Sequence, residues 1–380
     1  MRLLRRTLRR LHRWLGIGAG AVIAAVALSG AVLVFQWPLL KLQYPQLVQA
    51  PAPAPAEAAR ALPRILDDWS ARGVTAIDFP YAGLPVWQLY FEDGARRYLD
   101  ARSGELLLTR TLDNDVLLWL RELHVHLLAG EPGEQVLGVL GFAALFLLLS
   151  GLWQWWPRNR RVLSGLVPRW QPPPRRWVSW HRCAGVLGLP VTLVLIVTGT
   201  AMIYSAQTRA GLRALFGDGP EAVAPAPIAA SGGGVDWPKA IAAAQAAVPM
   251  QRLSRLGAPE PGSALAVLRV RMPGEWHPIG RSRIWLDLNT ARVVQAHDAT
   301  QQGYGARISE AIYPLHGAFV GGIGWMLLSL LGGLALCLLF VSGTLFWLAR
   351  RRAASDAVRL RLTTSYSAQS GRVRPIARRP

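Results

Sequence analysis

The chain has 380 residues, of which 52% are hydrophobic, and it carries a formal net charge of +20. The apolar fraction is high for an ordinary soluble domain of this length and indicates a membrane protein. The positive charge would suit a nucleic-acid-binding protein, but no groove-reading motif accompanies the arginines, so we expect no nucleic-acid partner.

Four apolar runs are long enough to cross a hydrocarbon layer, which takes about 20 helical residues. We predict transmembrane helices at residues 14–36, 136–156, 183–204 and 323–348. An Arg-rich start before the first run is also typical of a secretory signal peptide. The first run is longer than the roughly 7 to 15 apolar residues of such signals, so we expect a membrane anchor in the lipid bilayer.

The basic residues are concentrated in three segments. Residues 1–13, 157–180 and 349–380 contain 6, 6 and 9 Lys and Arg residues and one acid, Asp356. The remainder of the chain is nearly neutral. Four spans would place all three basic segments on one side of the membrane, and the positive-inside rule makes that side the cytoplasm. Both termini are therefore expected in the cytoplasm, with residues 37–123 and 205–315 outside it.

Two pairs of stretches repeat each other. Residues 12–35 align without a gap on residues 181–204, which places His12 on His181 and Ser29-Gly30 on Thr198-Gly199. A second alignment, with an offset of 192 residues, places His124 on His316 and Ser150-Gly151 on Ser342-Gly343. A histidine and a Ser/Thr-Gly pair thus recur at matching positions, which indicates an internal duplication.

The two segments outside the cytoplasm share an order of elements. In each, a linker rich in Pro and Ala precedes a short helical pattern, at 56–71 or 237–248, and strand-like alternation follows. The sequence thus predicts a mainly α membrane protein with four transmembrane helices and two small α+β ectodomains, built by duplication of a helix, ectodomain, helix unit. In chain order we predict the N-terminus with the first helix (1–36), the first ectodomain (37–123), the second helix with its lead-in (124–156), a basic loop (157–180), the third helix (181–204), the second ectodomain (205–315), the fourth helix (316–348) and a basic tail (349–380).

One histidine lies near an end of each predicted transmembrane helix: His12, His124, His181 and His316. Ionisable side chains are rare at such places and are usually functional. By the predicted topology, two of these histidines lie near each membrane face. Bis-imidazole ligation of a haem iron requires one neutral imidazole from each of two facing helices. The glycines that follow each histidine could leave room for a macrocycle or permit close helix packing.

Other ionisable residues are weaker candidates. His126 is an alternative to His124 as a ligand, but it aligns with Ala318 in the repeat. His277 and His297 have no repeat partner, and we expect them to be surface residues.

Two arginines directly follow candidate ligands. Arg13 follows His12, and Arg182 follows His181. They could pair with haem propionates, or they could belong only to the basic residues that set the topology.

Any haem is expected to be held without a covalent bond. The chain contains two cysteines, Cys183 and Cys337, and no C-x-x-C-H attachment sequence, so we predict b-type haem. No nucleotide-binding or hydrolase motif is present. Electrons would therefore come from a separate cytoplasmic donor or from quinol.

The strongest motif is the run from Leu123-His124 to Ala129-Gly130-Glu131-Pro132-Gly133. Together with Leu11-His12-Arg13-Trp14, Trp180-His181-Arg182 and Leu315-His316-Gly317, it resembles the PepSY-associated transmembrane helix family. The resemblance implies a bacterial inner-membrane ferric-siderophore reductase with two b haems and periplasmic ectodomains, which acts in iron uptake. It further implies that His12 and His181 hold the cytoplasmic-side haem, and His124 and His316 the periplasmic-side haem.

The chain departs from the family pattern at Ala291, which stands where the second Asp-x-x-Thr-Gly turn usually has glycine. It also lacks the flavin-reductase domain that is fused to some members. Two rival hypotheses remain. In the first, the PepSY-like ectodomains of a non-enzymatic membrane module bind a peptidase or an envelope partner. The second is haem or metal transport, for which the sequence lacks the broken, charge-lined helices of a transport path.

Overall fold

The computed structural model of the chain describes residues 2–156, 166–217, 223–257, 260 and 262–370. The chain divides into two compact units. The first consists of Met1–Leu28, Phe142–Leu193 and Leu331–Pro380, and the second of Ser29–Gly141 and Val194–Leu330. Residues 157–165 of the predicted basic loop, residues 220–222 of the second linker and residues 371–380 of the tail lie outside the described residues.

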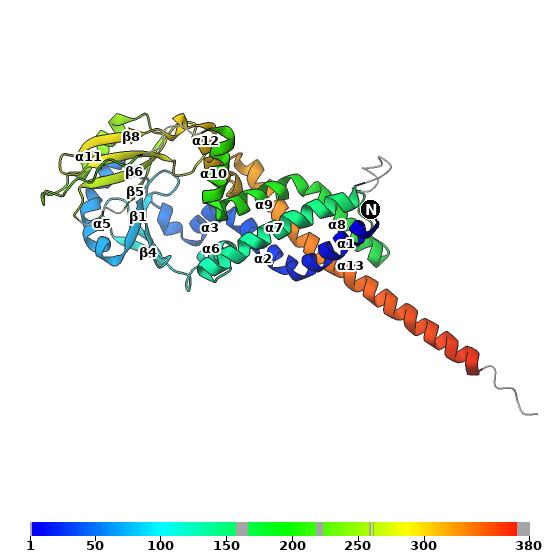
Figure 1. Cartoon of the computed structure of the whole chain (residues 1–380). Coiled ribbons are helices and arrows are strands. Elements are labelled where there is room, and N and C mark those ends of the chain that lie inside the picture. Colours follow the sequence, from blue (N-terminus) through cyan, green and yellow to red (C-terminus); the bar gives the residue numbers. More distant parts are fainter. Residues whose placement is uncertain (1, 157–165, 218–222, 258–259, 261, 371–380) are drawn as a thin grey trace, which may run out of the picture. The chain divides into compact units, whose positions relative to one another are not determined.

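Within the described residues, two helices are long and apolar enough to cross a membrane: α7 (Gly130–Trp155), and Gly322–Ala357 of α13 (Gly322–Ser370) (Figure 1). The number rises to four if each of two bent helix pairs is one span. These pairs are α1 (Arg2–Gly18) with α2 (Gly20–Leu33), and α8 (Pro173–Leu187) with α9 (Leu189–Ile203). The chain is a membrane protein with two to four spans, and α13 continues past the predicted end of the last span at residue 348.

Each bent pair lies where the sequence predicts a single span, at 14–36 or 183–204. The pairs bend by 57° and 65°, respectively. Gly18 and Gly20 flank the first bend, and glycine weakens a helix. Gly188 lies at the second bend, and Pro190 follows in the first turn of α9. Because proline has no backbone N–H, Pro190 cannot donate a hydrogen bond that would continue α8. The sequence predicts none of the broken, charge-lined helices of a transport path, and the structure shows that two helix pairs are in fact broken.

Eight strands of the second unit form one antiparallel sheet, in the order β4-β3-β2-β1-β5-β6-β7-β8. Their bounds are β1 Val74–Asp78, β2 Val86–Phe91, β3 Arg96–Asp100, β4 Leu106–Arg110, β5 Arg252–Gly257, β6 Leu265–Arg271, β7 Ser282–Asp287 and β8 Arg292–His297. The first four strands come from the first predicted ectodomain and the last four from the second.

The two predicted ectodomains therefore share a single sheet. Strand β1 pairs with β5, with Ala76 opposite Gly257 and Asp78 opposite Arg255. Each predicted ectodomain alone would leave an unpaired strand edge at this place, and pairing satisfies the backbone groups of both edges. The sequence predicts strands in both segments but not that they join in one sheet.

Short helices complete the second unit. The predicted helix at 56–71 is present as α4 (Pro55–Ala58), the 3-10 turns η2 (Ala59–Ala61) and η3 (Ser70–Arg72), and α5 (Leu62–Trp69), and the one at 237–248 as α11 (Trp237–Ala247). The remaining elements are α3 (Gln36–Gln43), η1 (Pro45–Val48), α6 (Val116–His126), α10 (Ser205–Phe216), η5 (Ala299–Gln301) and α12 (Tyr304–His316).

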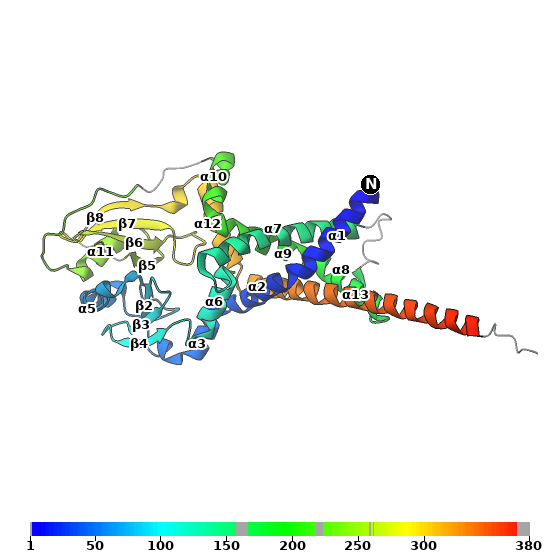
Figure 2. The same cartoon turned by 60° about the horizontal axis from the view of Figure 1, so that its bottom comes forward.

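The two faces of the sheet differ in chemistry, because successive side chains of a strand point to opposite faces. On one face, Trp87, Leu268 and Ile284 are fully buried in the main core, which α5 and α11 complete (Figure 2). On the other face, polar residues occupy the alternate positions, such as Tyr90 of β2 and Arg269 of β6. The apolar face builds the core, and the polar face is free to build a site.

Candidate functional site

His12 of α1 and His181 of α8 lie next to each other in the first unit. Their ring centres are 6.3 Å apart and the ring planes are 81° apart. His124 of α6 and His316 of α12 form a second pair within the second unit, with ring centres 6.0 Å apart and planes 38° apart. The structure thus brings the four predicted site histidines together as two pairs.

Each of the four rings makes the same contact through Nδ1. The partner is the hydroxyl of the Ser or Thr that precedes glycine in a Ser/Thr-Gly pair. These contacts join His12 to Ser150 (2.8 Å), His124 to Ser29 (3.2 Å), His181 to Ser342 (3.3 Å) and His316 to Thr198 (3.1 Å). The hydroxyls fix the orientation of the rings, which is the usual role of a group behind a metal-binding imidazole.

Two of the histidines also contact backbone carbonyls. Nδ1 of His181 lies 2.9 Å from the oxygen of Leu339, and Nδ1 of His316 lies 3.1 Å from that of Leu195. A carbonyl oxygen only accepts, so Nδ1 is the donor in both rings and Nε2 carries the lone pair. An imidazole in this tautomer can bind a metal through Nε2.

The glycine of each Ser/Thr-Gly pair lies against the same ring. A Cβ atom built on Gly30 would lie 2.6 Å from Cε1 of His124, and one on Gly199 would lie 2.8 Å from Cε1 of His316. The corresponding clearance is 3.2 Å for Gly151 with His12 and for Gly343 with His181. The missing side chains therefore provide the space that the four imidazoles occupy.

The geometry of each pair fits a metal that brings its own in-plane ligands. An ion held by protein side chains alone usually has three or four of them, and no group of three or more His, Cys, Asp or Glu in the described part of the chain could hold one. Metal–imidazole bonds of about 2 Å on both sides of one ion would place the ring centres about 6 Å apart, as they are here. A haem iron with two histidine ligands would require one imidazole from each of two helices, and each pair could supply these.

The other candidates lie as follows. Nδ1 of His126 contacts Oε1 of Glu122 at 2.8 Å on its own helix, so the structure places His124, and not His126, beside His316. The guanidinium of Arg13 lies 5.2 Å from the ring centre of Trp14, and both Arg13 and Arg182 are exposed. Their pairing with propionates stays a prediction.

Two glycines near the histidines serve close helix packing. A Cβ atom on Gly20 would lie 2.8 Å from the Phe340 ring, and one on Gly188 would lie 3.0 Å from Cβ of Ala335. At these positions the structure supports the packing interpretation of the glycines that follow the histidines.

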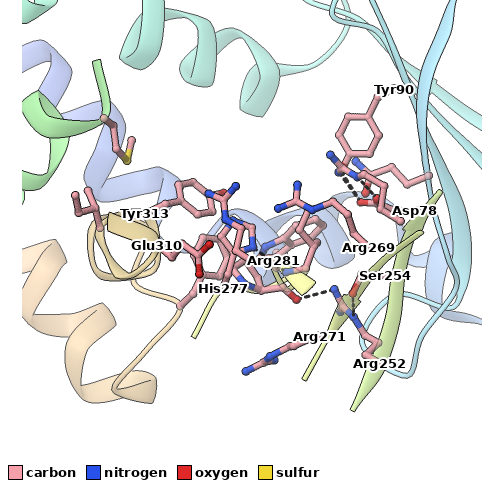
Figure 3. Close-up of a pocket in the computed structure, with 18 of the residues that line it drawn as sticks. Asp78, Tyr90, Arg252, Ser254, Arg269, Arg271, His277, Arg281, Glu310 and Tyr313 are labelled. Atoms are coloured by element: carbon pink, nitrogen blue, oxygen red, sulfur yellow. Dashed lines mark hydrogen bonds and ion pairs between the residues drawn. The ribbon is translucent and has the colours of Figure 1, made fainter. Parts of the chain in front are cut away.

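A cavity of about 940 Å³ lies on the polar face of the sheet in the second unit (Figure 3). The residues that line it belong to the sheet and to helices that include α6, α10 and α12. These lining residues include eleven arginines and two acids, Asp78 and Glu310. His277 also lines the cavity and is 7% exposed, so the expectation that it is a surface residue is wrong. His297 lines the same cavity and is half-buried.

The cavity is strongly electropositive. Burial, together with Arg281 and other arginines, lowers the pKa of His277 to about 3, so this imidazole is neutral. Burial raises the pKa of Glu310 to about 7 although Arg281 opposes the shift. Burial and the charge of Arg281 lower the pKa of Arg269 to about 10, which still leaves Arg269 protonated at neutral pH.

Neither the roles of the Ser/Thr-Gly pairs nor the cavity was part of the sequence prediction. The Ser/Thr-Gly pairs were visible as repeat markers, but their contacts with the histidines join distant segments. The arginines lie in a part of the chain whose net charge is nearly zero. The alternation in β6, where Arg269 and Arg271 are separated by Val270, is the local signal of a basic sheet face.

Comparison with known proteins identifies the family of the chain. The sequence matches the PepSY-associated TM region family over residues 9–350, a range that includes all four paired histidines. It is 29% identical over 268 residues to an uncharacterized protein of Pseudomonas aeruginosa, PA4219. The aligned region covers 64% of this chain and 66% of the relative, so the chain spans just under two thirds of the relative's length. Because the family match extends over most of the sequence, the chain belongs to the PepSY-associated TM region family.

Proposed function

We propose that the chain carries electrons across a bacterial inner membrane through two b-type haems and reduces a ferric chelate of the siderophore type on the periplasmic side. The observation that carries this proposal is the pairing of imidazole rings, 6.3 Å apart in one unit and 6.0 Å apart in the other. His12 and His181 would hold the inner haem, and His124 and His316 the outer one.

The distribution of charge supports the direction of transfer. The basic segments would hold both termini in the cytoplasm, which makes His12 and His181 the inner pair. His124 and His316 belong to the same unit as the sheet and its cavity, which would be periplasmic. The matching contacts of the four histidines are those expected of a duplicated unit.

Bound haem supplies a one-electron Fe(III)/Fe(II) couple. The four histidines would hold the two haems, and the Ser and Thr hydroxyls keep the imidazole rings in place. Arg13 and Arg182, which follow two of these histidines in the sequence, would neutralise propionates at the cytoplasmic side. The electron comes from a cytoplasmic donor or from quinol. One electron reduces the chelated Fe(III) to Fe(II), which oxygen donors attract less strongly because its charge is lower, so iron is released for uptake.

The test is haem content and the reduced-minus-oxidised spectrum of the purified protein and of four variants, His12→Ala, His181→Ala, His124→Ala and His316→Ala. We expect two b-type haems in the wild type. Either change in the first pair should remove one haem, and either change in the second pair should remove the other.

His126→Ala is the matched control, because His126 lies on the same helix as His124 but contacts Glu122. It should retain both haems. A folded wild-type protein without b-type bands would contradict the proposal, as would losses that do not group by pair. The alternative, a module that binds a peptidase or envelope partner, predicts that all four variants keep full function.

A further inference from the structure

We propose that the cavity on the polar face of the sheet is the substrate site and that it selects ferric chelates with several negative charges, such as catecholate or carboxylate complexes. This inference rests on the proposed function, and it names the class of chelate that is reduced. Its basis is the arrangement of arginines on three adjacent strands.

Arginines lie directly opposite each other across these strands. Arg255 of β5 is the register partner of Arg269 of β6, and Arg269 is the partner of Arg283 of β7. Arg252 is likewise opposite Arg271. Like charges at directly opposed positions destabilise a sheet, since their Cβ atoms are only about 4.5–5.5 Å apart. A row of this kind is favourable only if something negative compensates it.

The acids that the chain provides compensate only part of this charge. Asp78 accepts hydrogen bonds from both Nε and Nη2 of Arg255 and from the hydroxyl of Tyr90. Glu275, close to the cavity, accepts from the backbone N–H groups of Met272 and Arg281. Both carboxylates are therefore already engaged, and a pKa near 7 leaves Glu310 substantially protonated at neutral pH.

Two arginines in the cavity retain unused donors. The Nε atoms of Arg269 and Arg281 are buried and have no hydrogen-bond partner in the described structure. Nη2 of Arg269 donates to the carbonyl of Gly280 at 3.0 Å. Figure 3 shows both guanidinium groups pointing into the cavity between Asp78 and Glu310. A guanidinium presents donors in a planar fork that matches a carboxylate or a catecholate, so these two groups form a receptor for oxyanions.

The size and position of the cavity suit a chelate. About 940 Å³ lies near the upper end of small-molecule pockets, roughly 300–1,000 Å³, and far exceeds the volume of a single inorganic anion. Arg121 and Tyr313 line the cavity, and each lies three residues before a histidine of the second pair. Residues three apart on a helix are neighbours, so a bound chelate would lie close to the outer haem.

The charge of the cavity also favours the reaction. Transfer of one electron converts a ferric chelate into the ferrous chelate, which carries one more negative charge, and no proton or leaving group is required. The arginines stabilise the more negative product over the substrate, which raises the reduction potential of the chelate in the site. Free Fe(II) is a cation and is repelled by the same arginines, which attract the anionic ligand. Fe(II) should therefore leave the cavity while the ligand stays bound.

The test measures binding to the oxidised, haem-loaded full chain, so that no electron transfer is required. The probes are a multiply anionic ferric tris-catecholate and a cationic ferric tris-hydroxamate. We expect the wild type to bind the catecholate at least about 100-fold more tightly. The double variant Arg269→Gln/Arg281→Gln should lose about tenfold in affinity for the catecholate for each arginine, and its affinity for the cationic hydroxamate should not fall. Arg292→Gln is the control, because this exposed arginine of β8 removes the same charge outside the cavity.

Equal affinity of the wild type for both probes would overturn the inference, as would full affinity in a haem-loaded double variant. If the double variant does not fold, the salt dependence of wild-type binding decides. Affinity for the catecholate that is unchanged between about 50 and about 500 mM salt would contradict a charge-based site. Tighter binding of glycerol phosphate than of the catecholate would assign the cavity to a lipid headgroup and also overturn it. Haem spectra of the same samples report on the proposed function separately.

Discussion

Gly199 and His316 are in direct contact across two helices of the second unit. A Cβ atom on Gly199 would come within 2.8 Å of Cε1 of His316, while the hydroxyl of the preceding Thr198 lies 3.1 Å from Nδ1 of the same ring. One dipeptide thus sets both the position and the hydrogen bonding of a candidate ligand. The same relationship occurs at all four histidines, and it leads to predictions that do not require any histidine to be changed.

The first prediction concerns the glycines. Gly199→Ala and Gly30→Ala should each displace a ring of the second pair, because real Cβ atoms do not approach other atoms to 2.8 or 2.6 Å. We expect loss of the haem that His124 and His316 are proposed to hold, measured as haem per protein. Gly151→Ala and Gly343→Ala should be milder, since their clearance is 3.2 Å. Gly211→Ala on α10, with nothing within 4 Å, is the control, and an equal loss there would contradict the argument.

The second prediction separates hydroxyl partners from carbonyl partners. Ser150→Ala removes the hydroxyl that holds Nδ1 of His12, whereas after Thr198→Val the carbonyl of Leu195 still accepts from His316. Groups behind a ligand typically contribute about 10- to 100-fold in metal affinity. Haem should therefore dissociate from Ser150→Ala at least about tenfold faster than from wild type, and Thr198→Val should show a smaller effect. Equal dissociation rates in the two variants would argue against this difference.

How much the sequence could predict depends on whether a feature is local. The four histidines were identifiable because imidazoles at the ends of apolar helices are rare, and their matched positions indicated two pairs. The bends near Gly18 and Gly188 were not predicted, because hydropathy reports the length of an apolar run and not its direction. Gly20 and Gly188 were noted in the sequence, but only as residues that leave room for a macrocycle or permit close packing, and not as sites of a bend.

The shared sheet and the basic cavity depend on contacts between distant segments. The alternation within either ectodomain does not specify that β1 pairs with β5. The paired residues are distant in the sequence, and 177 residues separate Asp78 from Arg255. The net charge of this part of the chain also gave no sign of the cavity, because acids and arginines balance along the sequence but not on the polar face of the sheet. Which charges lie on that face is determined only by the folded structure.

The third prediction is a pH dependence of chelate binding. Arg281, Arg209, Arg269 and Glu275 act on Glu310, and burial raises its pKa to about 7. As pH rises from 6 to 8, Glu310 becomes negative and repels an anionic chelate, so affinity should fall. His277, with a pKa of about 3, stays neutral in this range. Glu310→Gln should bind the chelate as tightly at pH 8 as wild type does at pH 6. If the affinity of this variant falls with rising pH as much as that of wild type, the assignment to Glu310 is wrong.

The fourth prediction concerns stability in acid. His277 has a folded-state pKa of about 3, below the model-peptide value of 6.5, so the unfolded chain binds a proton between these values and the folded chain does not. Stability from this group is complete above about pH 6.5 and is lost as pH falls toward 3. His277→Gln should therefore lose less thermal stability between pH 7 and pH 4 than wild type. Melting temperatures at both pH values test this, and parallel losses in both proteins would contradict it.

The last prediction concerns Asp78 and the joint between β1 and β5. Asp78→Asn removes the carboxylate that Arg255 contacts, and the side chains of this pair are only 16% and 21% exposed. Breaking a buried pair typically costs about 3–5 kcal/mol, and partial exposure should reduce this cost to about 1–3 kcal/mol. The variant should therefore melt at a lower temperature.

The Asp78→Asn variant should also carry one more uncompensated arginine in the cavity, so a multiply charged anion such as pyrophosphate should raise its melting temperature more than that of wild type. Asp68→Asn, whose carboxylate is half exposed and contacts Arg64 on α5, is the control and should change neither quantity. A lower melting temperature without the larger response to pyrophosphate would mean that Asp78 only stabilises the strand joint and does not set the charge of the cavity.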